Sequence, residues 1–182
     1  MKLGKLVTRV VVGTLFIGHG TQKLFGWFDG PGPDQTGAYF ESAGLRPGRR
    51  HALLAGAAEA GGGALLALGL FTPVAAAALS GVMITAILTV HLEKGPWVTK
   101  GGYEYNLVLL AALLALADDG PGDASLDAAL GTGASGPLVA IGQLAAGALG
   151  SQIAIAGSDP RSWWAGDEAR FTEAEAEPVA GR

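Results

Sequence analysis

The sequence predicts an all-α membrane protein, a polytopic helical bundle with a four-helix core and a fifth transmembrane helix. The chain has 182 residues and a mean hydropathy of +0.37, and its charged residues make up 15%, against about 25% in a typical soluble domain. Between His51 and His91 the only ionisable side chain is Glu59, and residues 128–158 contain none. Because a soluble helix needs a polar face, uncharged runs of this length indicate membrane spans.

Five apolar segments are predicted to cross the membrane as helices, and they cover residues 6–28, 52–70, 74–92, 103–117 and 137–156. The fourth segment is the shortest, about 22 Å at the rise of an α-helix. The run of Asp, Gly and Pro at residues 29–34 ends the first segment, because proline and glycine there cannot continue a helix. A short helix is expected before Gly44.

The domain organisation that follows is a bundle over residues 1–130, a fifth span within 131–158 and an acidic tail over 159–182. Ser135 is the expected N-cap of the fifth span, and Pro137 suits its first turn. The tail is low in aliphatic residues and rich in acids, a composition typical of disorder.

Charge and cysteine content exclude several classes of function. The net charge is −4 and no basic stripe is present, so nucleic acid is not an expected partner. The chain has no cysteine, which excludes thiol–disulfide exchange, iron–sulfur clusters and thiolate metal sites. Lys2, Lys5 and Arg9 precede an apolar run as in a secretory signal, but polar residues 19–23 stand where a cleavage site is needed, so we interpret the segment as a retained span.

The polar residues of the predicted spans are expected to gather at one membrane face. Successive helices run in opposite directions, so the end of the first, the start of the second, the end of the third and the start of the fourth lie together. Lys23 and Glu59 then lie about 7 to 11 Å deep and His19 about 13 Å deep. His91 and Glu104 lie near the boundary. Most aromatic residues lie at this face too, and the opposite face has few beyond Phe71. The sequence therefore predicts a polar half-cavity that opens to one side.

Two interpretations of these residues stay open. A charge at the centre of a helix costs at least about 2.5 to 3.5 kcal/mol on insertion scales, so Lys23 and Glu59 could pair for stability alone, with His19 as a hydrogen-bonded neighbour. In the functional interpretation, Glu59 and Glu104 exchange protons, while His19, Lys23 and His91 donate hydrogen bonds to the headgroup of a ligand.

Metal and haem chemistry are not expected at this cluster. His19, Glu59, His91 and Glu104 include the right kinds of ligand for a metal, but the nearby cation of Lys23 argues against one. The estimated depths of His19 and His91 differ by more than haem ligation tolerates.

Several separated motifs resemble the DoxX family of small bacterial membrane proteins. They are His-Gly-Thr-Gln-Lys-Leu-Phe-Gly at residues 19–26, Glu59 with its neighbouring glycines, Leu-Gly-Leu-Phe-Thr-Pro at 68–73, Gly-Gly-Tyr-Glu-Tyr-Asn at 101–106, and the segment 120–127. The resemblance covers about residues 5–130 and implies a four-helix bundle in the cell membrane of a bacterium. It also implies redox associations, since some relatives are subunits of a thiosulfate:quinone oxidoreductase and others belong to oxidative-stress complexes. The wider group resembles the vitamin K epoxide reductase-like bundles, whose reaction uses pairs of cysteines. This chain has no cysteine, so that activity is not expected here.

The leading hypothesis is a membrane subunit that binds a quinone, or a similar headgroup, and serves a soluble or membrane redox partner. Electrons must come from that partner or another substrate, because the chain shows no redox centre of its own, and neither haem nor an iron–sulfur cluster is an expected cofactor. Whether the chain is itself an enzyme or an accessory subunit stays open, as do its orientation and its oligomeric state. The alternatives are a transporter of small solutes or protons and a membrane scaffold for a soluble redox enzyme.

Overall fold

The computed structural model describes residues 2–158, and all of its regular elements are helical. The main helices are α1 (Leu3–Phe25), α2 (Gly32–Ser42), α3 (Gly48–Leu68), α4 (Thr72–Ala86), α5 (Glu104–Asp119), α6 (Leu126–Leu130) and α7 (Pro137–Ala156). Helix α4 continues through a π-helical turn, Ile87–His91, and a 3₁₀ turn, Leu92–Lys94, and a second 3₁₀ turn covers Val98–Lys100. The predicted disordered tail, residues 159–182, lies outside the described residues.

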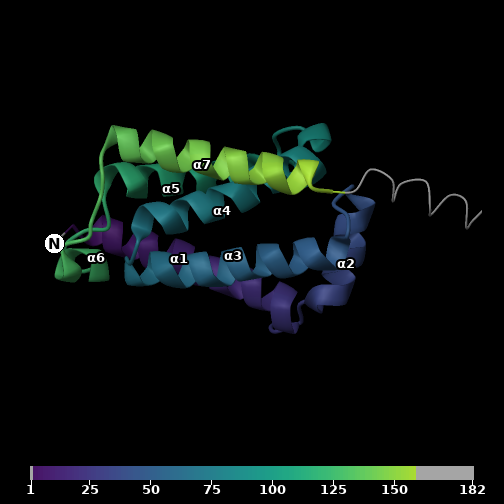
Figure 1. Cartoon of the computed structure of the whole chain (residues 1–182), viewed down its shortest axis with the longest axis horizontal. Helices are drawn as coiled ribbons and strands as arrows, with labels where there is room; N and C mark the ends of the chain where they lie inside the picture. Colours follow the sequence, from purple (N-terminus) through teal and green to yellow (C-terminus); the bar gives the residue numbers. More distant parts are fainter. Residues whose placement is uncertain (1, 159–182) are drawn as a thin grey trace, which may run out of the picture.

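The long helices form two layers (Figure 1). Helices α1 and α3 make one layer, and α4, α5 and α7 make the other. Helix α2 lies at one end of the bundle and α6 at the opposite end, beside the start of α1. The predicted short helix is α2, and Pro33 takes a first-turn position in it, where proline is tolerated.

Three of the five predicted spans are long and apolar enough to cross a membrane, namely Gly48–Leu68, Thr72–Lys94 and Pro137–Ala156. These cover the predicted second, third and fifth spans. Helix α5 has 16 residues, and α1 has 23 residues but carries Lys5, Arg9, His19 and Lys23. Both pack within the same bundle, and their crossing of the membrane stays a prediction.

Small residues allow α1 and α3 to pack closely, as the glycine-rich second span predicts. A Cβ added at Gly20 would lie 2.4 Å from the backbone nitrogen of Ala60, and one added at Gly63 would lie 2.6 Å from the carbonyl oxygen of Gly13. No side chain larger than hydrogen fits at either glycine without moving a backbone. Gly61 faces away from the contact, since a Cβ added there would have nothing within 4 Å.

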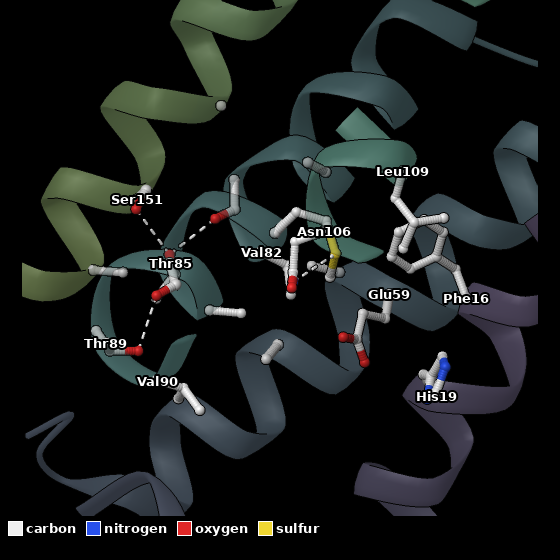
Figure 2. A pocket seen from close by; sticks show the side chains of 18 of the residues that line it. Phe16, His19, Glu59, Val82, Thr85, Thr89, Val90, Asn106, Leu109 and Ser151 are labelled. Atoms are coloured by element: carbon white, nitrogen blue, oxygen red, sulfur yellow. Dashed lines mark hydrogen bonds between the residues drawn. The ribbon is translucent and has the colours of Figure 1, made fainter. Parts of the chain in front are cut away.

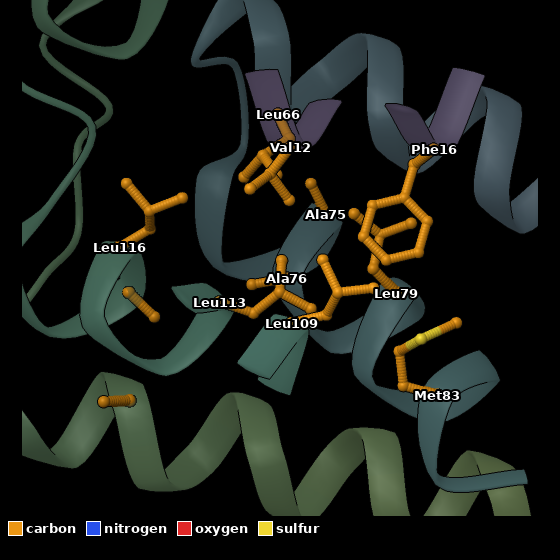
Figure 3. Close-up of a cluster of buried hydrophobic side chains, with 12 residues drawn as sticks. Val12, Phe16, Leu66, Ala75, Ala76, Leu79, Met83, Leu109, Leu113 and Leu116 are labelled. Atoms are coloured by element: carbon orange, nitrogen blue, oxygen red, sulfur yellow. The ribbon is translucent and has the colours of Figure 1, made fainter. Parts of the chain in front are cut away.

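The hydrophobic core fills the space between the two layers (Figure 3). Phe16 from α1, Leu66 from α3, Leu79 from α4 and Leu113 from α5 are each at most 1% exposed. The α6 end of this space is therefore solidly packed with apolar side chains.

The α6 end also holds a buried arginine, which corrects the expectation that the polar residues of the predicted spans all gather at the opposite face. Arg9 is 2% exposed. Its guanidinium donates hydrogen bonds to the carbonyl oxygens of Ala67 (3.3 Å), Pro121 (2.5 Å) and Ala124 (2.6 Å). Arg9 is thus not a flanking charge of the first helix. Its hydrogen bonds join α1 to the end of α3 and to the segment before α6.

Asp127 completes this cluster from α6. Its carboxylate accepts hydrogen bonds from the backbone N–H groups of Phe71 (2.9 Å) and Thr72 (3.0 Å) and from the hydroxyls of Thr72 (2.8 Å) and Thr132 (2.9 Å). The bonds hold Phe71 in the left-handed region, φ 47°, and satisfy the first N–H groups of α4. Burial favours the neutral carboxyl, but the hydrogen bonds from Thr72, Phe71 and Thr132 outweigh it and lower the pKa of Asp127.

Helix α7 is an integral part of the second layer and not an appendage to a four-helix core. Ser80 of α4 donates a hydrogen bond of 3.1 Å to Gln143, and Thr85 donates one of 2.9 Å to Ser151. Between these polar contacts, a Cβ added at Gly147 would lie 2.8 Å from the carbonyl oxygen of Ala77, so the backbones of α4 and α7 also approach closely.

The predicted cap of α7 is wrong, although its boundaries are as predicted. The N-cap is Gly136 and no side chain caps the helix. Gly136 adopts φ 112°, a conformation that only glycine enters readily, and its N–H donates to the carbonyl oxygen of Asp118. That backbone bond anchors the start of the helix in the place of Ser135.

Candidate functional site

A cavity of about 720 Å³ occupies the space between the layers at the α2 end of the bundle. Its walls come from α1, α3, α4 with its π-helical turn, α5 and α7, and Figure 2 shows side chains from these elements pointing into it. Phe16, Met83 and Leu109 line the cavity and also belong to the hydrophobic core. These three side chains therefore form the floor that separates the cavity from the packed end.

The lining is mostly apolar, and it reaches the outer surface of the bundle. Leu15, Leu54 and Val74 line the cavity while remaining 46%, 56% and 64% exposed. In a bilayer such exposed apolar positions face lipid. The cavity is of a size typical of small-molecule sites, which combine apolar walls with a few convergent polar groups.

Lys23 and Glu59 form an ion pair in the cavity wall, as the antiparallel arrangement predicts. The distance from Lys23 Nζ to Glu59 Oε2 is 2.6 Å, and the two side chains are 20% and 3% exposed. The close contact of Gly20 with Ala60 brings α1 and α3 near enough for this pair to form. Its two opposite charges leave this part of the cavity without a net charge.

The two predicted histidines also line the cavity. His19 lies one helical turn before Lys23 and interacts electrostatically with Glu59, and Figure 2 shows the His19 and Glu59 side chains on the same side of the cavity. His91 ends the π-helical turn, a feature often found at functional sites. Its Nδ1 lies 2.6 Å from the carbonyl oxygen of Gly101, and since a carbonyl only accepts, Nδ1 carries the proton that is donated.

Glu104 is not brought into the cavity with the other four residues. It is the first residue of α5, its backbone N–H donates to the carbonyl oxygen of Pro96, and it is absent from the lining. Its predicted part in proton exchange stays a prediction. Within residues 2–158, no three His, Asp or Glu side chains are placed to hold a metal ion.

Comparisons with known proteins agree with the geometry of a membrane bundle. A family model named DoxX matches residues 4–92. A protein of Bacillus subtilis (strain 168) named "Putative oxidoreductase CatD" is 32% identical over 115 residues, which are 63% of this chain and 79% of the relative. The chain belongs to the DoxX family. No solved structure matches it.

The DoxX match covers α1 to α4 and hence four of the predicted site residues. His19, Lys23, Glu59 and His91 all lie within residues 4–92, whereas α5 and α7 lie beyond it. Both later helices line the cavity. In this DoxX-family protein the cavity is thus completed by elements outside the matched segment.

Several polar residues of the cavity escape prediction from the sequence. Asn106 of α5, Thr85 and Thr89 of α4 and its continuation, Ser151 of α7 and His51 of α3 all line it. The hydroxyls of Thr85 and Thr89 also bond to helix carbonyls one turn back, a common arrangement that gives no functional signal in sequence. Asn106 offers a faint signal, because it is the last polar residue before an uninterrupted apolar run to Ala117.

The arrangement provides hydrogen-bond donors and acceptors in an apolar enclosure. Lys23 offers donors, Glu59 offers acceptors, and a neutral His19 offers one of each. A neutral His91 offers only an acceptor, Nε2, because its N–H already donates to the carbonyl oxygen of Gly101. Because these groups act away from bulk water, their hydrogen bonds to a ligand gain strength from the low local dielectric.

Proposed function

We propose that this protein binds the headgroup of a quinone, or of a similar small amphiphile, in the cavity between its two layers and serves a redox partner at the cell membrane. The observation that carries the proposal is the ion pair of Lys23 with the buried Glu59 in the wall of a mostly apolar cavity of about 720 Å³. A ring with polar oxygens and an apolar body matches such a lining.

The residues have distinct tasks in this proposal. Lys23 and His19 donate hydrogen bonds to a carbonyl oxygen of the ligand, and His91 contributes from the π-helical turn. Glu59 accepts hydrogen bonds and exchanges protons with the ligand oxygen, with Glu104 as a proton-exchange group nearer the surface. A quinone supplies two-electron chemistry when bound. Since the chain has no cysteine, the electrons come from the partner and not from a thiol pair of this protein.

The route of entry follows from the exposed part of the lining. Leu15, Leu54 and Val74 are reached from the outer face of the bundle. An amphiphile dissolved in the bilayer can therefore enter sideways, with its headgroup moving toward the ion pair and its chain remaining among apolar side chains.

A substitution that fills the cavity tests this function. Gly150 of α7 lines the cavity and has nothing within 4 Å of an added Cβ, so Gly150→Phe enters open space without disturbing helix packing. We expect at least tenfold weaker binding of decylubiquinone to the purified full chain in nanodiscs, measured by titration, with no loss of thermal stability.

The matched control is Gly142→Phe on the same helix. Gly142 also has nothing within 4 Å of an added Cβ, but it does not line the cavity. This variant should bind as the wild type does. A wild-type protein that takes up no quinone, or equal binding by the two variants, contradicts the proposed function.

A further inference from the structure

Asn106 is a buried polar residue whose hydrogen-bonding capacity the protein leaves largely unused. Its side chain lines the cavity and is 6% exposed. The amide nitrogen donates to the sulfur of Met83 at 3.5 Å, and thioether sulfur is a weak acceptor. Within the described residues the amide oxygen accepts no hydrogen bond. A buried polar group left in this state lowers stability, so its presence calls for an explanation.

Asn106 faces the cavity from the layer opposite to the ion pair. It belongs to α5, whereas Lys23 and Glu59 belong to α1 and α3. Figure 2 shows Asn106 beside Val82, with its amide directed into the space that Glu59 and His19 also face. Polar groups thus lie on both walls of a mostly apolar cavity.

The two walls offer the same combination of hydrogen-bonding groups. An ammonium group only donates and a carboxylate only accepts, so the ion pair together provides both, and a carboxamide provides both by itself. A carbonyl oxygen needs a donor, whereas a hydroxyl needs an acceptor. Each wall can therefore bind an oxygen substituent in either form. The ion pair is neutral overall and the amide is uncharged, so the site favours an uncharged ligand.

We infer that Asn106 is a ligand-binding residue that holds the second oxygen of a ring with oxygen substituents on opposite sides, and that the site binds this ring in both its carbonyl and its hydroxyl form. The inference rests on the proposed function and extends it, because it names the second contact and the class of ligand. Duroquinone and durohydroquinone have these properties and lack a tail, so they probe the ring contacts alone.

The test compares two variants of Asn106 with a second buried amide. Asn106→Leu removes the amide at similar volume, and Asn106→Ala removes it without adding bulk. Gln143 is 4% exposed, has an amide nitrogen without a partner in residues 2–158 and does not line the cavity. Gln143→Leu is thus the matched control. Binding of duroquinone and of durohydroquinone to the full chain is measured by calorimetric titration, and thermal unfolding is followed in parallel.

We expect both Asn106 variants to bind each ligand at least tenfold more weakly than the wild type, and Gln143→Leu to bind as the wild type does. The melting temperature of Asn106→Leu should equal or exceed that of the wild type, because a poorly satisfied polar group is lost from a buried position. A residue with a purely structural role would instead lower it.

Three results overturn the inference while the wild type still binds, and thus leave the proposed function standing. They are unchanged binding by both Asn106 variants, loss in Asn106→Leu alone, which would indicate a steric effect, and loss of binding together with a lowered melting temperature. Absence of wild-type binding to duroquinone, durohydroquinone and decylubiquinone would instead refute the proposed function and this inference with it.

Discussion

The two ends of the bundle treat buried polar residues in opposite ways. At the α6 end, Arg9 donates to three carbonyl oxygens and Asp127 accepts four hydrogen bonds, all from the protein itself. At the α2 end, Lys23, Glu59 and Asn106 line a cavity, and the amide of Asn106 has only a sulfur partner among the described residues. The polar groups at the α6 end therefore form their hydrogen bonds within the protein. Those at the α2 end keep donors and acceptors that can bind a ligand.

This difference leads us to expect stability effects at the α6 end and binding effects at the α2 end. The largest effect is expected for Asp127→Ala. The substitution leaves the N–H groups of Phe71 and Thr72 without their acceptor and removes the negative charge that interacts with Arg9. We expect the free energy of unfolding to fall by about 3 to 5 kcal/mol, the range for breaking a buried charged contact. Unfolding in a denaturing detergent series measures it.

Asp118→Ala is the control for this prediction. Asp118 is exposed at the end of α5, and a surface substitution of this kind changes stability by about 0.5 kcal/mol or less. Equal losses in the two variants would show that the acidic character of the segment matters, and not the hydrogen bonds of Asp127.

The second effect distinguishes a structural from a functional Lys23–Glu59 pair. Lys23→Met leaves the 3% exposed carboxylate of Glu59 without its cation, so we expect a loss of about 3 kcal/mol in the free energy of unfolding. Adding Glu59→Gln removes the uncompensated charge and should restore stability to within about 1 kcal/mol of the wild type. Quinone binding should be lost in both the single and the double variant. Retained binding in the stable double variant would mean that the pair only holds α1 to α3.

The smallest effect is the pH dependence that Asp127 confers on the α6 end. Because hydrogen bonds lower the pKa of Asp127 in the folded protein, folding favours its ionised form. The stability that it contributes is complete above the unfolded pKa, about 3.9, and is lost as the pH falls below that value through the folded pKa. Unfolding of the wild type and of Asp127→Asn should therefore be compared from about pH 7 to about pH 3, with the difference shrinking at the acid end. A constant difference would contradict this assignment.

The sequence predicts the helices well where local signals suffice. Apolar runs and the Gly and Pro residues between them locate α3, α4 and α7, because a helix is set mainly by its own side chains and its breakers. Alternating helix direction then brings Lys23 to Glu59, in the cavity that His19 and His91 also line. The family resemblance, drawn from motifs in the same residues, is confirmed.

Arg9 and Asp127 show where sequence reasoning stops. Each looks like an ordinary charge at the edge of an apolar segment, and only the approach of α6 and the segment before it to the starts of α1 and α4 gives each of them its own hydrogen-bond partners. The same holds for Glu104, which lies at the correct end of α5 yet does not reach the cavity wall.

The sequence by itself determined that this protein is a helical membrane bundle with a lysine and an acid facing each other from its first and third helices. Only the tertiary structure decided that α7 forms a wall of the cavity, that Asn106 faces the ion pair, and that the opposite end is closed by a buried arginine. The physical reason is that apolar runs act within a helix, whereas the rotation of each helix about its axis depends on contacts with elements far away in the chain.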